Sequence, residues 1–229
     1  MALTNKLTAI ANAIRTKTGG TSQLSLDEMA TAIAGIETGG GATEPYVEET
    51  YDTVGHLISA NLVGHTRISS YAFYNHEYLQ NVILPSSIVA IPAGAFQNCT
   101  ALSLSSLPPN VTYIGKQAFA YCSNLTLNNL PPDTAVIEQA AFYGCSKIAL
   151  MSLPASITTL GYQCLGSTNL SSITFEGTPT TINGGAFYSC ANLTTINVPW
   201  AEGAVANAPW GATNATINYN YTGGSTDVE

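Results

Sequence analysis

The sequence predicts a solenoid built mainly of short β-strands with helical turns, in about six coils of 22–23 residues, preceded by a small helical hairpin. The main observation is a large apolar residue that returns at intervals of 23, 23, 23, 23 and 22 residues. The members of this column are Phe73, Phe96, Phe119, Phe142, Leu165 and Phe187. Ala precedes five of them and Cys164 precedes Leu165, so a whole motif is repeated. Self-similarity at a fixed period of about 20 to 50 residues is typical of solenoids and repeat arrays.

The composition of the 229-residue chain excludes several classes of partner. Only 9% of the residues are charged, and the net charge is −8. Six Lys and Arg residues cannot form the basic face that phosphate backbones require, so we predict no binding of nucleic acid. No run approaches the ~18 apolar residues of a membrane span. The start of the chain lacks the profile of a secretory signal, which predicts a protein that works inside a cell or reaches the exterior within a larger particle.

Residues 1–38 are expected to form the helical hairpin. Apolar residues recur at three- and four-residue spacing on both sides of Gly19-Gly20, and Ser25 stands three residues before Glu28, as in a capping box. The apolar stripe includes Leu3, Leu7, Ile10, Ile14, Met29 and Ile33. Two helices this short are marginal alone, so we predict that the stripe docks on another copy of the chain or on a partner protein. Folding back onto the solenoid is the alternative.

The remaining segments can be placed in order along the chain. We predict a Gly-rich linker at 39–45, an N-terminal cap at 46–67, the solenoid at 68–199, a C-terminal cap at 200–222 and a disordered tail at 223–229. Caps are expected because the open end of a solenoid exposes its core. After Pro199 the repeat pattern is expected to stop, and the only two Trp residues are expected to cover the last coil.

Within each repeat the consensus is Ile-x-x-x-Ala-Phe-x-x-Cys-x-x-Leu-x-x-x-x-Leu-Pro-x-x-Ile. The sequence predicts strands at Leu79–Leu84, Leu102–Leu107, Leu125–Leu130, Ile148–Leu153, Leu170–Phe175 and Leu193–Val198. Pro is expected to end most of them, because it has no N–H to donate. The Ala-Phe-x-x-Cys corner predicts one helical turn. The fifth repeat has Leu165 in place of Phe and has lost one residue, which predicts a local kink.

The cysteine column can be interpreted either as a metal site or as part of the core. Cys99, Cys122, Cys145 and Cys190 each stand three residues after the column residue. Metal sites usually use local pairs such as Cys-x-x-Cys, which the chain lacks, so we predict that these residues fill the core. His56, His65 and His76 have no metal-binding spacing. There is no Gly-x-Ser-x-Gly motif or paired carboxylate pattern, so we predict no catalytic residue, no metal, no cofactor and no enzyme activity.

A polar row is the remaining candidate for binding. The residue before the second apolar strand position should point away from the core. This row contains Ile83, followed by the candidate binding residues Ser106, Asn129, Ser152, Thr174 and Asn197. Hydroxyls and amides on a rigid sheet can hydrogen-bond a glycan or the polar surface of a protein. A merely solvated face is the alternative.

The repeat resembles a known family. The segments Ile-Gly-Lys-Gln-Ala-Phe-Ala-Tyr-Cys-Ser-Asn-Leu (114–125) and Ile-Glu-Gln-Ala-Ala-Phe-Tyr-Gly-Cys-Ser-Lys-Ile (137–148) are similar to the BspA-like class of bacterial leucine-rich repeat. The resemblance covers about residues 62 to 199. It implies a leucine-rich-repeat solenoid with a role in adhesion or protein binding, and it carries no catalytic residues.

The ends of the chain resemble tail-associated proteins of bacteriophages that infect Gram-positive hosts. The similar segments are 10–20, 26–33 and 198–217. This resemblance implies a virion structural protein of the tail, fibre or host-attachment apparatus, a homo-oligomer that contacts other virion proteins or itself through the hairpin and a host protein or glycan through the solenoid. The alternative hypothesis is a bacterial adhesion or protein-interaction module, at the cell surface or in the cytoplasm.

Overall fold

The computed structural model describes residues 46–222, which belong to the second of two units into which the chain divides, residues 45–229. The hairpin predicted at residues 1–38, the linker at 39–45 and the tail at 223–229 lie outside the described residues. Residues 46–222 contain twelve short strands and no helix. The strands are β1 (Tyr46–Tyr51), β2 (Leu57–Val63), β3 (Asn81–Ile83), β4 (Ala90–Ile91), β5 (Tyr113–Ile114), β6 (Val136–Ile137), β7 (Ser152–Leu153), β8 (Thr159–Leu160), β9 (Ser172–Phe175), β10 (Thr181–Ile182), β11 (Thr195–Asn197) and β12 (Thr216–Asn218).

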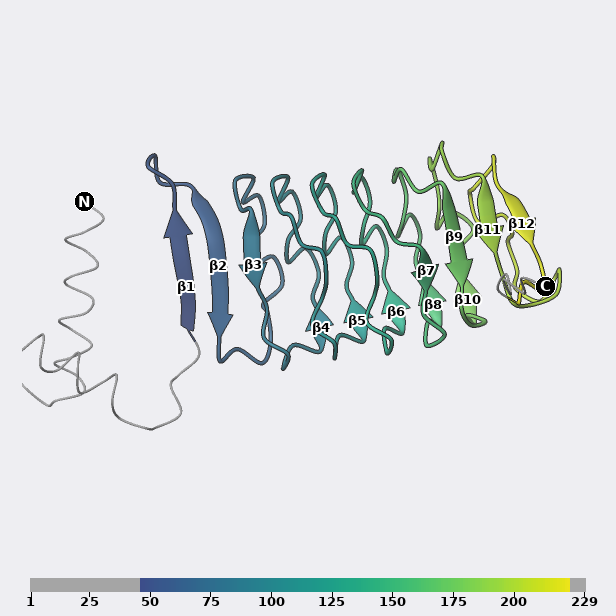
Figure 1. Ribbon diagram of the computed structural model, residues 1–229, viewed down its shortest axis with the longest axis horizontal. Coiled ribbons are helices and arrows are strands. Elements are labelled where there is room, and N and C mark those ends of the chain that lie inside the picture. The colour runs from purple at the N-terminus through teal and green to yellow at the C-terminus, as the bar shows by residue number, and fades with distance from the viewer. Residues whose placement is uncertain (1–45, 223–229) are drawn as a thin grey trace, which may run out of the picture. The chain divides into compact units, whose positions relative to one another are not determined.

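The strands lie in three sheets on a stack of coils (Figure 1). Their orders are β1-β2-β3, β10-β8-β6-β5-β4 and β12-β11-β9-β7. Only β1 and β2 pair in an antiparallel sense, and every other pair is parallel. Parallel partners are one coil apart in sequence, as Tyr113 and Val136 are in β5 and β6. This is the strand arrangement of a solenoid, in which each coil contacts its two neighbours.

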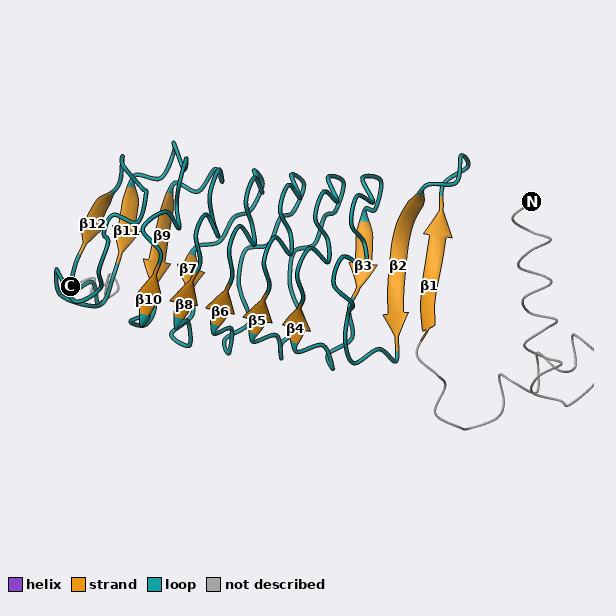
Figure 2. Cartoon of the chain, turned by 180° about the vertical axis from the view of Figure 1, so that it is seen from behind, coloured by secondary structure: helices purple, strands orange, loops and turns teal. Residues whose placement is uncertain are grey.

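The predicted strands are confirmed in four coils and wrong in two. β3, β7, β9 and β11 lie inside four of the predicted segments. The segments 102–107 and 125–130 contain no strand, and Figure 2 shows loop where the coils between β3 and β7 cross this face. The five-stranded sheet from β4 to β10 lies at the apolar residue that opens each repeat, where the sequence predicted no strand.

The spacing of the apolar residues explains which coils form strands on this face. Where β3, β9 and β11 form, the two buried or half-buried apolar residues are two positions apart, at Val82/Leu84, Ile173/Phe175 and Ile196/Val198. In the second and third coils they are three apart, at Leu104/Leu107 and Leu127/Leu130. Side chains of a strand alternate between faces, so a spacing of three leaves two consecutive residues pointing outward and interrupts the strand. The fourth coil also has a spacing of three, and its strand β7 has only two residues.

The corner at the column residue is a series of tight turns, so the prediction of a helical turn there is wrong. In the first coil, Tyr71 and Asn75 have left-handed backbones with φ of 59° and 61°. A left-handed residue cannot continue a right-handed helix. Alternate amides bond to the next coil: Phe73 donates to the Ala95 carbonyl at 2.8 Å, and Asn75 donates to Gln97 at 2.9 Å. The same left-handed pair recurs at Gly94/Asn98, Gln117/Tyr121, Ala140/Gly144 and Gln163/Ser167. The corner is therefore a hydrogen-bond ladder along the stack.

The core behind this corner is a stack of phenylalanine rings. The rings from Phe73 to Phe142 are nearly parallel, with adjacent centroids 5.2–5.5 Å apart. Leu165 ends the stack, and Phe187 instead meets Phe175 edge to face at 6.4 Å. The backbone ladder continues past this point, because the Leu165 amide still donates to the next coil, to the Ala186 carbonyl at 3.1 Å. The irregular fifth repeat thus changes the ring stack and leaves the ladder intact.

The cysteines are buried in this core and form no disulfide. Each cysteine that stands three residues after a column residue donates its thiol hydrogen to the carbonyl of the column residue one coil earlier. An example is Cys122 Sγ to Phe96 O at 2.9 Å. Cys99, Cys145 and Cys190 make the same bond at 3.0 Å. Burial raises the pKa of Cys99 and of Cys145 to about 12. In the fifth coil buried Thr168 takes this position, and its hydroxyl donates to the Leu165 carbonyl at 2.8 Å.

The repeat continues beyond Pro199, contrary to the expectation that it stops there. β12 pairs in parallel with β11, so residues 200–222 add one further coil. Trp210 stands 23 residues after Phe187 and is fully buried, and its carbonyl accepts from the Phe187 amide at 2.9 Å. Trp200 packs edge to face against Phe175 at 5.2 Å. At the other end β2 pairs in parallel with β3, and β1 covers β2.

Candidate functional site

The predicted polar row lies along one face of the stack. Ser152 is directly opposite Thr174, Thr174 is opposite Asn197, and Asn197 is opposite Asn218 in the next coil. Near the other end, Ile83 pairs with Asn61 of β2. The strand register therefore brings together the later members of the row and extends it by one residue at each end.

The later part of the row is bonded to itself. Asn218 Nδ2 donates to Asn197 Oδ1 at 2.8 Å, and Asn197 Nδ2 donates to Thr174 Oγ1 at 3.1 Å. Ser152 Oγ donates to the Glu176 carboxylate at 2.6 Å. Thr174, Asn197 and Ser152 are also half-buried. These three side chains stabilise the stack of coils and have less capacity left for a ligand.

Ser106 and Asn129 differ, because both are exposed and lie in the two segments without strands. The backbone amides of residues 104–107 and 126–130 donate no backbone hydrogen bond within residues 46–222. Together with their outward Ser and Asn side chains, these two segments form what we call the open face. Its unpaired N–H groups are available to water or to a ligand, whereas the Leu127 carbonyl accepts from the Ala149 amide at 3.0 Å.

Two grooves lie on this side of the stack, where the apolar spacing changes; the first borders the open face, and the second lies one coil beyond it. The first, of about 360 Å³, separates the first and second coils and is lined in part by Ile83, Leu104, Ser106 and Pro109. The second, of about 260 Å³, separates the fourth and fifth coils and is lined in part by Leu150, Met151, Asn169 and Ser172. Ile83 is 51% exposed and Met151 is 67% exposed. The site thus combines polar groups with an exposed apolar side chain in each groove.

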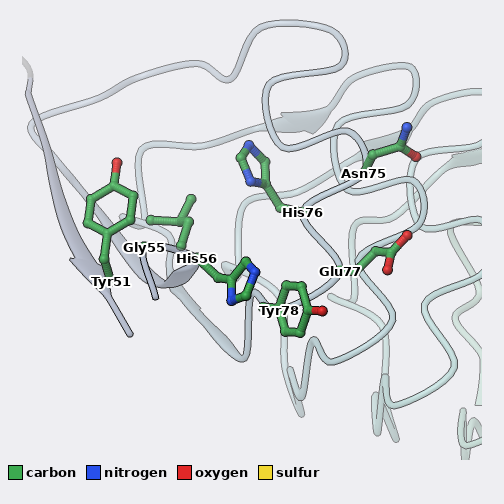
Figure 3. A pocket seen from close by; sticks show the side chains of 8 residues that line it. Tyr51, Gly55, His56, Asn75, His76, Glu77 and Tyr78 are labelled. Carbon is green, nitrogen blue, oxygen red and sulfur yellow. The ribbon is translucent and has the colours of Figure 1, made fainter. Parts of the chain in front are cut away.

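A third hollow, of about 300 Å³, lies between the β1–β2 hairpin and the first coil (Figure 3). The His56 ring stacks on Tyr78, with centroids 3.8 Å apart, and its Nδ1 is 2.8 Å from Asp52 Oδ2. The pKa of Asp52 is lowered, mainly because its carboxylate accepts a hydrogen bond from the His56 backbone amide. His76 and Glu77 line the same hollow.

The hollow does not assemble a nucleophile with a base. Within residues 46–222, no Ser, Thr or Cys side chain is hydrogen-bonded to an imidazole, and no group of three or more His, Cys, Asp or Glu side chains is placed to hold a metal ion. His65 does not line this hollow with His56 and His76. In the same part of the chain no helix has the length and apolar character needed to cross a membrane.

The chain belongs to the BspA type leucine rich repeat region family, whose sequence profile matches residues 66–194 in six copies. The matched segment is more than half of the chain and contains the Phe column, the Cys column and the open face. No protein of curated function is significantly similar in sequence.

Several solved structures are similar to the solenoid. A leucine-rich repeat protein of T. pallidum, TpLRR, is 23% identical with a TM-score of 0.52, over 67% of this chain and 82% of that chain. A leucine rich cell surface protein of Faecalibacterium prausnitzii is 22% identical with a TM-score of 0.45, over 70% and 56% of the two chains. A leucine-rich repeat protein of Bacteroides ovatus is 18% identical with a TM-score of 0.32, over 71% and 60%. The likeness to TpLRR shows a shared fold.

The sequence identified the polar row and missed the grooves. Of the candidate site residues, Leu3, Leu7, Ile10, Ile14, Met29 and Ile33 lie outside the described residues. Ile83 was noted only as the apolar member of the row, and Met151 was not singled out. The change of apolar spacing from two to three residues, visible in the sequence alone, marks both grooves.

Proposed function

We propose that the chain is a non-enzymatic binding module for bacterial surface adhesion or protein interaction, and that it contacts its partner through the open face. Membership in the BspA type family supports a role in binding. The single observation that carries the choice of surface is the open face itself, where Ser106 and Asn129 are exposed between two grooves.

The chemistry of this surface suits a protein partner. Apolar side chains anchor an interface by filling pockets, and surrounding polar groups provide hydrogen bonds. Ile83 and Met151 are exposed apolar side chains, and the unpaired backbone N–H groups between them supply hydrogen-bond donors. The coils that carry them are held by the ladder at the opposite corner, so little ordering is needed when a partner binds.

Charged substitutions on the open face test this proposal. Full-chain protein on beads is presented to epithelial cell monolayers and to purified extracellular-matrix proteins. Ser106→Arg with Asn129→Arg is expected to lower bead retention at least about tenfold, because two bulky charges block the face. The control pair is Val89→Arg with Thr181→Arg, at exposed positions outside the open face. Equal retention of both pairs, or no retention of the unmodified protein by any surface, would contradict the proposal.

A virion role is the second candidate, and the apolar stripe predicted in residues 1–38 and the resemblance of the terminal segments favour it. The family match covers residues 66–194 and therefore supports only the binding module. If the hairpin attaches the chain to a particle, deletion of residues 1–38 abolishes incorporation into virions and leaves the solenoid folded. Unchanged incorporation would rule out the attachment role.

A further inference from the structure

A second surface stands out at the corner opposite to the strand face, where tyrosines gather beside the Phe column. Six tyrosines lie within three residues of a column residue: Tyr71, Tyr74, Tyr121, Tyr143, Tyr162 and Tyr188. All except half-buried Tyr143 are 42–54% exposed. Within residues 46–222, none of the six hydroxyls is hydrogen-bonded to another protein group. The rings and hydroxyls are therefore accessible to a ligand.

Glycines make room for four of these rings, those of Tyr71, Tyr121, Tyr143 and Tyr162. Five of the six tyrosines are followed 23 residues later by Gly, which is the equivalent position of the next coil in every pair except Tyr162/Gly185. The pairs are Tyr71/Gly94, Tyr121/Gly144, Tyr143/Gly166, Tyr162/Gly185 and Tyr188/Gly211. A Cβ added to Gly185 would lie 2.4 Å from the Tyr162 ring, and one added to Gly166 would lie 3.1 Å from the Tyr143 ring. A side chain in place of either glycine would displace the ring that lies over it.

Four of the tyrosines lie on successive coils, from the third to the sixth. The rings of Tyr121 and Tyr143 meet edge to face, with centroids 5.4 Å apart. Gly166 lies between the Tyr143 ring and the backbone of Tyr188, since its added Cβ would be 3.1 Å from both the ring and the Tyr188 carbonyl oxygen. Tyr162 lies over the neighbouring Gly185. We call Tyr121, Tyr143, Tyr162 and Tyr188 the tyrosine strip; it runs along the stacking direction.

Tyr121 has a backbone conformation that is energetically unfavourable for a tyrosine. Tyr121 has a left-handed φ of 63°, and the equivalent residue of the next coil is Gly144 with φ of 73°. A bulky side chain in this region is strained, and residues held in that way gather at binding and catalytic sites. Packing alone does not require an aromatic ring here, since Ser167 occupies the same position in the fifth coil.

The charge around the strip restricts the class of ligand. Residues 139–146, 148–175 and 177–201 contain no Asp, Glu, Lys or Arg. The corners of the fourth to sixth coils thus offer no countercharge to an anionic or cationic ligand. They offer aromatic faces with free hydroxyls, next to amide and hydroxyl side chains such as Gln139, Gln163 and Ser189. Such a surface suits a neutral molecule that presents both C–H faces and hydroxyl groups.

We propose that the tyrosine strip binds the chain of a neutral polysaccharide. A pyranose ring packs its C–H face on an aromatic ring, while its hydroxyls bond to neighbouring polar groups. Because the rings follow one another along the stack, a linear glycan contacts several of them at once, and weak single contacts combine. This surface is distinct from the open face, and the proposal is independent of the one made there.

Native gel electrophoresis through gels that contain amylose, mannan, xylan or β-1,3-glucan tests the proposal. The unmodified full chain is expected to be retarded by at least one of the four. Tyr143→Ala with Tyr162→Ala and Tyr188→Ala should weaken retardation at least about tenfold. The matching Tyr→Phe triple variant should retain most of it, because it keeps the rings. The control is Tyr113→Ala, which removes an exposed tyrosine of β5 outside the strip.

The outcomes separate the glycan from other partners. Retardation should persist from low to high salt, since no charge takes part. Thermal unfolding of each variant shows that the fold is retained. The proposal would be overturned if none of the four polysaccharides retards the protein, or if the triple Ala variant is retarded as strongly as the unmodified chain. It would also be overturned if the strip is needed to bind a protein partner and not a glycan.

Discussion

The corner and the open face lie on the same coils and are held in different ways. At the corner, a backbone ladder connects the coils, and stacked Phe rings and thiol hydrogen bonds reinforce it in most of them. On the open face, the amides of residues 104–107 and 126–130 donate no backbone hydrogen bond; one groove borders this face and another lies one coil beyond it. One side provides rigidity, and the other leaves polar groups unpaired for a partner. If the open face is the binding surface, stability and binding are separated within a single repeat.

Removal of a ring from the corner should have the largest effect. Phe119→Ala is expected to lower the free energy of unfolding by about 3 to 5 kcal/mol, because Phe119 is fully buried between two rings. Asn129→Ala on the open face should change it by less than about 0.5 kcal/mol. Urea unfolding measures both. Phe119→Leu copies the fifth repeat and should cost less than Phe119→Ala; similar losses at Phe119 and Asn129 would remove the distinction between the two sides.

The thiol column should contribute less than the rings. Cys122→Ala is expected to cost about 1 to 3 kcal/mol, because it leaves a small cavity and removes the donor to the Phe96 carbonyl. Cys122→Thr keeps a donor and most of the volume and should cost less; Thr168 is tolerated at this position of the fifth coil, where it donates to the Leu165 carbonyl of its own coil. Urea midpoints of the two variants provide the comparison. Equal losses would show that the hydrogen bond adds nothing to the packing.

A change of apolar spacing should convert the open face into a strand face. Leu104→Ser combined with Ser105→Leu moves the apolar residue to two positions before Leu107, as in β9 and β11. The second coil should then pair with β3, and amide exchange at residues 105–107 should slow at least about tenfold. Hydrogen exchange with mass spectrometry measures this. Ser105→Leu alone is the control, because Leu104 then stays in place; unchanged exchange in the double variant would disprove the role of spacing.

Ionisation of the thiols should have the smallest effect on the free energy of unfolding at neutral pH. In the folded chain, burial raises the pKa of Cys99, Cys145 and Cys164 from 9.0 to about 12. The stabilisation that this provides is complete below pH 9.0 and is lost as the pH rises toward 12, because the unfolded chain releases these protons first. The urea midpoint should therefore fall above pH 9, and less steeply for Cys99→Thr with Cys145→Thr. Rapid labelling of native thiols by Ellman's reagent at pH 8 would contradict their burial.

Much of the fold could be predicted because one period repeats the same local pattern. The Phe and Cys columns were correctly placed in the core, and four of six strand segments contain strands. The two wrong segments have the same apolar ends as the others, and the position of Leu104 and Leu127 distinguishes them from the segments of β3, β9 and β11 but not from the fourth coil, where β7 has two residues. The polar row was also found, but its division into bonded residues and the exposed Ser106 and Asn129 depends on neighbours one coil away.

The sequence by itself determined the coil length, the core columns and the weakly charged surface, since these follow from a periodic choice of residue types. The tertiary structure decided which backbone groups find a partner. A strand in a solenoid forms only when the adjacent coil presents matching N–H and C=O groups, and that match depends on orientation across the stack. For the same reason, the turns at Tyr71 and Asn75 and the extra coil at Trp210 depend on how the coils stack.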